Sequence, residues 1–137
     1  MTVPECSQST HAASSSTTSP TYQHLTPFIE QCSSTMAACT NCAERSHEEG
    51  LSCWKNCRPA AELTTCLMRL IALNYGNEKV LQSLMNAVKA VLTQCSEHCA
   101  RHANEHCTKC AQECRKLVKD LEEFQPTPVS ITSVIGM

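Results

Sequence analysis

The 137-residue sequence contains only three glycines, and its aromatic side chains are limited to one tryptophan, two tyrosines and two phenylalanines. Glycine-rich phosphate loops are thereby excluded, because they need several glycines close together. The 11 basic and 13 acidic side chains are mixed along the chain, so no basic stripe predicts a nucleic-acid partner. No segment reaches the roughly 18 successive apolar residues of a membrane span. A chain of this length can bury one modest core, and we expect a single domain.

Signatures of catalysis are also missing. The sequence has neither a nucleophile-elbow glycine pattern nor a Ser/His/Asp order typical of hydrolases. A Cys-x-x-Cys redox enzyme would place that motif beside a strand and a helix, and no alternating apolar run of strand length is present. We therefore predict that the protein is not an enzyme.

The N-terminal sequence bears on the compartment. Residues 1–20 lack the basic leader and the apolar run of a signal peptide, which predicts a cytoplasmic protein. In that compartment thiols stay reduced, so a cysteine-dense chain more often binds metal than forms disulfides.

Cysteine is the abundant feature, with twelve in the chain. One of them, Cys6, lies in a Ser/Thr-rich opening with too little apolar surface to offset the entropy of ordering it. We predict that residues 1–21 form a disordered tail and that Cys6 takes no part in metal binding.

Apolar residues and cysteines spaced by three and four predict the first two helices. The first is expected from Thr26 to about Gly50. The second is expected to end near Gly76, because glycine suits a helix C-terminus. A break is predicted at Pro59, since the residue before proline avoids the helical region and proline favours a first helical position.

The third helix is the clearest in the sequence. Asn77 can cap its N-terminus, and the heptad-like spacing continues as far as His102. The fourth helix ends before Pro126, which cannot continue a helix. These elements predict an all-α fold, an antiparallel up-down four-helix bundle with a cysteine-lined core over residues 22–125. Residues 126–137 are predicted to be a flexible tail.

The first and third turns of such a bundle lie at the same pole, and most of the cysteines fall near these two turns. Cys32 and Cys66 are expected to reach deeper into the core. On one continuous helix Cys57 and Cys66, nine residues apart, would face opposite sides. The break at Pro59 removes this conflict and leaves Cys53 and Cys57 on a separate turn. The opposite pole is expected to be lined by hydrocarbon, from Leu70, Leu73, Leu81, Leu84, Leu121 and Phe124.

Cysteines three or four residues apart place both sulfurs on one helix face, about 5 to 6 Å apart, so each pair can bind one ion from two sides. Soft thiolates favour Cu(I), zinc or iron-sulfur clusters. About one Cu(I) per shared thiolate leaves a buried array near neutral, whereas zinc with four thiolates leaves two negative charges at each site. The thiolates predicted to bind several Cu(I) ions per chain are Cys32, Cys39, Cys42, Cys53, Cys57, Cys66, Cys95, Cys99, Cys107, Cys110 and Cys114.

Two other side chains are candidate metal ligands. Met36 shares a helix face with neighbouring cysteines, either as a thioether ligand or as a core residue that fills a gap. His102 follows Cys99 by three residues and so shares its face, which would place it at the mouth of the bundle. The remaining two histidines of this region, His98 and His106, each adjoin a cysteine in the sequence and are expected to point into solvent.

Alternatives from the structural class remain open. The cysteines could form a structural zinc site, or a disulfide-stabilised helical interaction module in an oxidising compartment. A ferredoxin-type iron-sulfur run would end in Cys-Pro, and no cysteine here precedes proline.

The stretch from Cys95 to Cys99 and the stretch from His106 to Arg115 resemble the third and fourth helices of a known family, the cysteine-rich four-helix-bundle copper storage proteins of bacteria. The resemblance spans residues 22–124. It implies a homotetramer of bundles that stores many Cu(I) ions through cysteine thiolates, with His or Met ligands at the bundle mouth. The expected partners are copper ions and a copper chaperone. The family carries further cysteines where this chain has Leu117 and Leu121, which predicts a lower capacity.

Overall fold

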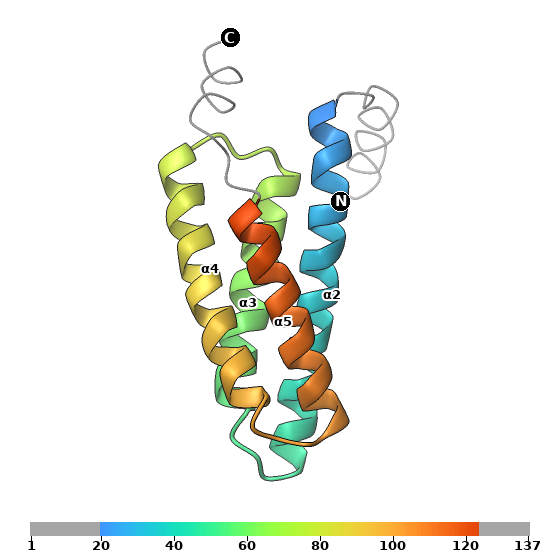
Figure 1. The fold of residues 1–137 in the computed structure, drawn as a ribbon. Coiled ribbons are helices and arrows are strands. Elements are labelled where there is room, and N and C mark those ends of the chain that lie inside the picture. Colours follow the sequence, from blue (N-terminus) through green and yellow to red (C-terminus); the bar gives the residue numbers. More distant parts are fainter. Residues whose placement is uncertain (1–19, 124–137) are drawn as a thin grey trace, which may run out of the picture.

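The computed structural model describes residues 20–123, with side chains described from Leu25 onward. Successive helices in this part run in opposite directions, and each packs against two neighbours (Figure 1). The predicted all-α, antiparallel four-helix bundle is confirmed. Its helices are α2 (Pro20–Glu48), α3 (Trp54–Ala72), α4 (Glu78–Cys99) and α5 (Glu105–Glu123).

Different helix connections lie at the two ends of the bundle. The α2–α3 and α4–α5 connections lie together at one end, which we call the mouth pole (Figure 1). The α3–α4 connection lies at the other end, which we call the leucine pole. The predicted tails fall mainly on residues 1–19 and 126–137, which lie outside the described part, so their disorder stays a prediction. Within residues 20–123, no helix is long and apolar enough to cross a membrane.

A residue in the left-handed backbone conformation follows the end of two of the helices. Gly50 has a φ of 77°, and the Leu51 N–H then donates to the Ser46 carbonyl at 2.8 Å, which closes α2 near the predicted residue. At the end of α3 the left-handed residue is Asn74, with a φ of 59°, rather than the expected Gly76. Asparagine tolerates this conformation better than most residues, which explains why no glycine is needed there.

The start of α4 is as predicted. The Asn77 side chain accepts a hydrogen bond from the Val80 N–H at 3.1 Å and so satisfies one free donor of the first turn. The helix ends at Cys99 with Ala100 as its C-cap, and His102 therefore lies in the connection that follows, not on the helix.

The predicted break in the second helix is wrong. Pro59 lies inside α3, which runs without interruption from Trp54 to Ala72. Pro59 is the sixth residue of α3, past the first turn, so it removes one intrahelical hydrogen bond, and the packing of α3 against α2 and α4 outweighs that loss. The helix is therefore continuous, and Cys57 and Cys66 do face opposite sides, with Cys57 buried and Cys66 exposed.

Hydrocarbon fills the core toward the leucine pole. Leu81 and Leu84 are half-buried and pack against this part of the core, as predicted. Leu73 is 76% exposed, so the expectation that it lines the core is wrong, because α3 has ended before it. Phe124 lies outside the described residues. The buried apolar side chains here are Phe28, Leu67, Ile71, Met85 and Leu121.

A buried carboxylate joins α5 to α2. Glu113 is 4% exposed, accepts a hydrogen bond from Gln31 Nε2 at 2.8 Å, and pairs with Lys109 at 3.1 Å and Lys116 at 3.3 Å. The Thr35 hydroxyl donates to the Glu113 carbonyl oxygen at 3.0 Å. Burial raises the pKa of Glu113, but the Gln31 hydrogen bond and the two ammonium groups outweigh it and lower the pKa. These contacts fix the axial offset of α5 against α2, on which the sulfur geometry depends.

Changing Glu113 to Ala should lower the free energy of unfolding by about 1 to 3 kcal/mol, because Gln31 loses its buried acceptor. Urea unfolding of the metal-free protein measures this. The matched control is Glu122→Ala, an exposed carboxylate on the same helix, with an expected change within about 0.5 kcal/mol. Since the folded-state pKa of Glu113 is lowered, its stabilisation is present above the unfolded-state pKa and is lost as pH falls through the folded-state pKa. Equal stability of the two variants at neutral pH would contradict a role in joining the helices.

Candidate metal centre

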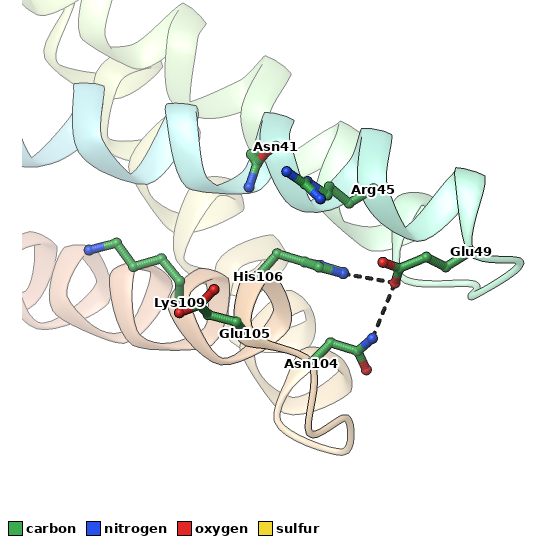
Figure 2. A pocket seen from close by; sticks show the side chains of 7 residues that line it. All are labelled: Asn41, Arg45, Glu49, Asn104, Glu105, His106 and Lys109. Carbon is green, nitrogen blue, oxygen red and sulfur yellow. Dashed lines mark hydrogen bonds and ion pairs between the residues drawn. The ribbon is translucent and has the colours of Figure 1, made fainter.

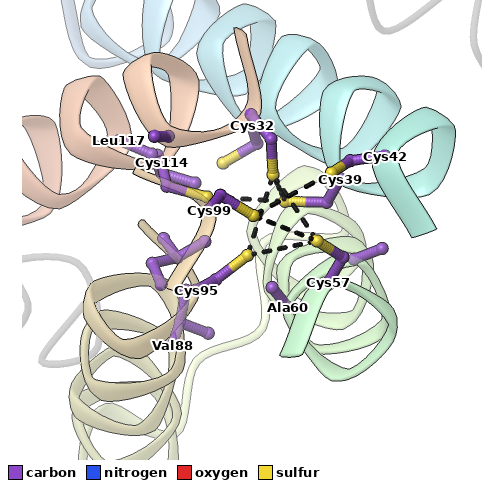
Figure 3. Close-up of a cluster of buried hydrophobic side chains, with 14 of the residues drawn as sticks. Cys32, Cys39, Cys42, Cys57, Ala60, Val88, Cys95, Cys99, Cys114 and Leu117 are labelled. Atoms are coloured by element: carbon purple, nitrogen blue, oxygen red, sulfur yellow. Dashed lines mark hydrogen bonds between the residues drawn. The ribbon is translucent and has the colours of Figure 1, made fainter. Parts of the chain in front are cut away.

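The cysteines of the described part are free, and all of them except Cys66 are buried. Their sulfurs come from all four helices and from the α2–α3 connection. Figure 3 shows the side chains of Cys39, Cys57, Cys95 and Cys99 turned toward one another in the middle of the bundle. The sulfurs form overlapping sets in which every ligand atom lies within 4.8 Å of the others.

The deepest set joins α2, α4 and α5. It contains Cys39, Cys95, Cys110 and Cys114. The Sγ atoms of Cys39 and Cys114 are 3.5 Å apart, and Cys110 Sγ lies 3.7 Å from both Cys39 and Cys95. Four sulfurs at these distances can surround one ion.

The second set lies one step nearer the mouth pole and draws on all four helices. Its members are Cys42, Cys57, Cys99 and Cys110. Cys57 Sγ is 3.5 Å from Cys99 and 3.8 Å from Cys110, while Cys42 Sγ is 3.9 Å from Cys99. Cys110 thus belongs to both of the first two sets.

The third set combines Cys42 with Cys53 and Cys107. Cys107 Sγ lies 3.9 Å from Cys42 Sγ and 3.8 Å from Cys53 Sγ. The fourth set ends at the surface and holds Cys53 with the half-buried His98 and His102. The exposed Ser52 hydroxyl lies 3.2 Å from His98 Nε2.

Shared residues connect the sets into one array, which we call the thiol ladder. Cys110 links the first and second sets, Cys42 the second and third, and Cys53 the third and fourth. An ion can therefore move from the surface to the deepest set by exchanging one sulfur at a time. Soft ions that accept two or three sulfur ligands suit such an arrangement.

Hydrogen bonds among the thiols shift their pKa values in opposite directions. Bonds from Cys110 lower the pKa of Cys42 and that of Cys95. The pKa of Cys110 is raised, chiefly through its hydrogen bond with Cys114, and burial raises the pKa of Cys107. A metal that binds the thiols whose pKa is raised must displace their protons.

Two of the predicted cysteine ligands lie outside the ladder. Cys32 is fully buried, but it belongs to none of the sets; burial, together with the nearby Asp120, raises its pKa to about 12. Cys66 is exposed, which contradicts the expectation that it reaches into the core, because continuous α3 turns it to the outer face. Met36 is half-buried and packs against the buried core, and its role as a thioether ligand stays a prediction.

The histidines differ most from expectation. His102 does reach the mouth pole beside Cys53, but through the α4–α5 connection and not through a helix face. The expectation that His98 and His106 point into solvent is wrong: His98 belongs to the fourth set, and His106 Nδ1 lies 3.5 Å from the sulfurs of both Cys42 and Cys107. Adjacency to a cysteine on the same helix predicted that each histidine faces away from the thiols. Both histidines lie at helix ends, however, where a side chain can also contact a neighbouring element.

Comparison with known proteins adds an independent observation to this geometry. The model of one protein family, described as Copper storage protein, matches residues 21–126. The chain belongs to the copper storage protein family. Neither the curated proteins nor the solved structures gave a match. The family resemblance predicted over residues 22–124 is thus confirmed, and the match covers all four helices that supply the ladder.

The residues matched by the family model include all the buried, free thiols that could hold metal ions. The disulfide-stabilised alternative is not what the structure has, since every cysteine in residues 20–123 is free.

Proposed function

We propose that the protein stores several Cu(I) ions per chain in the thiol ladder. The observation that carries this proposal is the overlap of the four sets through shared cysteines. A thiolate that bridges two ions contributes half its charge to each, so about one Cu(I) per cysteine leaves the array near neutral. The ladder supplies nine such cysteines, namely Cys39, Cys42, Cys53, Cys57, Cys95, Cys99, Cys107, Cys110 and Cys114.

Zinc is the second candidate, because the first two sets each hold four sulfurs, as structural zinc sites do. The sets share Cys110, so two zinc ions held there would share one bridging thiolate. Seven thiolates around two zinc ions would bury three negative charges in the bundle, and no basic side chain lies among the buried residues of the described part. Cu(I) fits the donor set better because it leaves the array closer to neutral.

Catalytic activity, compartment, partner and oligomeric state are further parts of the proposal. We propose a protein without catalytic activity that works in the cytoplasm, because an oxidising compartment would convert neighbouring thiols to disulfides. A copper chaperone is the proposed donor or recipient. The homotetramer is proposed from the family resemblance, and light scattering of the apo and copper-loaded protein tests it.

Anaerobic titration of the reduced metal-free protein with Cu(I), against a competing chelator, should saturate at about nine ions per chain, close to one for each ladder cysteine. Saturation near ten or eleven would add Cys32 or Cys66 to the ligands. The same protein titrated with Zn(II) is the comparison. Saturation at two or three Zn(II), with weak uptake of Cu(I), would overturn copper storage in favour of a structural zinc site.

A further inference from the structure

A polar cavity opens on the side of the bundle, between the last turns of α2 and the first turn of α5. Its volume is about 470 Å³, which is in the range of small-molecule sites. Figure 2 shows the side chains of α2 facing those of α5 across this space. We call it the lateral pocket. It is lined by Asn41, Arg45, Glu49, Asn104, Glu105, His106 and Lys109.

The inner wall of the lateral pocket adjoins the thiol ladder. His106 lines the pocket, and its Nδ1 atom lies 3.5 Å from Cys42 Sγ and 3.5 Å from Cys107 Sγ. On its other edge, His106 Nε2 lies 2.9 Å from a Glu49 carboxylate oxygen, which also accepts a hydrogen bond from Asn104 at 3.1 Å. One imidazole ring therefore separates the pocket from the third thiol set. This approach is lateral, whereas Cys53, His98 and His102 occupy the end of the bundle.

Some charged side chains of the pocket have an ion-pair partner and others do not. Glu49 is paired with His106, and Lys109 is paired with Glu113. Arg45 and Glu105, by contrast, have no ion-pair or hydrogen-bond partner among the side chains of the described residues. Both are exposed and line the same cavity from opposite helices. The pocket thus presents one unpaired guanidinium and one unpaired carboxylate.

This pair of charges defines the ligand chemistry. A guanidinium binds a carboxylate through two parallel hydrogen bonds, and a carboxylate binds an ammonium group. A small zwitterion carries both groups. Because the inner wall leads to thiols that bind soft metal, a zwitterion that also carries a thiol could bring the ion with it.

We infer that the lateral pocket binds a small zwitterionic thiol as its Cu(I) complex and passes the ion to Cys42 or Cys107. The inference rests on the proposed storage of Cu(I). In the transfer, the bond between copper and the carrier sulfur breaks, and a bond between copper and the cysteine sulfur forms. The cysteine proton ends on the carrier sulfur, which leaves as a thiol. No electron is transferred, so copper stays Cu(I).

Binding to the pocket can be measured without copper. Reduced glutathione, added to the metal-free protein, should shift the amide NMR signals of residues around Arg45 and Glu105 in a saturable manner. Free cysteine as a second probe distinguishes an amino-acid thiol from a peptide thiol as the carrier. The Arg45→Glu variant should lose the shifts, while Arg58→Glu, an exposed charge reversal on α3, should keep them. Shifts that survive Arg45→Glu, or their absence from the unmodified protein with both probes, would overturn the lateral pocket as a thiol site.

Transfer of the ion is tested separately. With Cu(I)-glutathione as donor below saturation, Arg45→Glu should load about tenfold more slowly than Arg58→Glu, because an attraction between ionised groups becomes a repulsion. Both variants should reach the capacity of the unmodified protein. Glu105→Gln gives a second variant if Arg45→Glu disturbs the fold by circular dichroism. Equal loading rates for the pocket variants and Arg58→Glu would overturn the inference about the lateral pocket. Failure of the unmodified protein to take up several Cu(I) ions would instead overturn storage itself.

Discussion

Changing Cys110 to Ser should reduce the Cu(I) capacity by two or more ions per chain. Cys110 belongs to both the first and the second thiol sets, and its sulfur lies within 4 Å of Cys39, Cys57 and Cys95. A hydroxyl is a poor ligand for Cu(I), so both sets lose a bridging sulfur at once. Anaerobic titration against a chelator measures the number of ions.

The chain supplies a matched control for this substitution. Cys66→Ser removes a sulfur that is exposed and outside the sets, so its capacity should equal that of the unmodified protein. Both serine variants should keep the helical circular dichroism of the metal-free protein, because serine is close to cysteine in size. If Cys110→Ser and Cys66→Ser lose the same number of ions, the sets do not act through shared sulfurs.

Changing Leu67 to Asp should unfold the metal-free bundle or destabilise it by more than about 4 kcal/mol. Leu67 is fully buried in α3, and the substitution both opens a cavity and buries a carboxylate without a partner. Thermal unfolding followed by circular dichroism measures the loss. The control is Leu73→Asp, at a 76% exposed position six residues further along the chain, where the melting temperature should hardly change.

Circular dichroism of the unmodified protein with and without Cu(I) shows how copper binding and folding are related. A zinc finger is unfolded without its ion, because there the binding energy is the folding energy. Here the hydrocarbon of the leucine pole is buried whether or not metal is present, and protonated cysteines can remain inside as small, nearly apolar side chains. The metal-free protein should therefore be helical, and copper should raise its melting temperature. A metal-free chain that becomes helical only when Cu(I) is added would contradict a preformed bundle.

Some features followed from the sequence by itself. The spacing of apolar residues and cysteines determined four helices, Asn77 as a cap, and the end of the first helix near Gly50. These are local properties, because helix period, capping and left-handed turns depend on residues a few positions apart. Alternating helix directions then brought most of the cysteines to one pole, since the first and third turns of an up-down bundle meet there.

The ligand sets depended on information that the sequence does not hold. Which sulfurs lie within 4 Å across helices depends on the rotation and axial offset of each helix, and long-range contacts such as Gln31 with Glu113 fix these. A continuous α3 excluded Cys66, although the residue before Pro59 predicted a break, because packing along the whole helix outweighs one local preference. The last turn of α4 and the first turn of α5 likewise brought His98 and His106 to the thiols. The sequence by itself thus determined that sulfur gathers at one end of a helical bundle, and only the tertiary structure decided which sulfurs can share an ion.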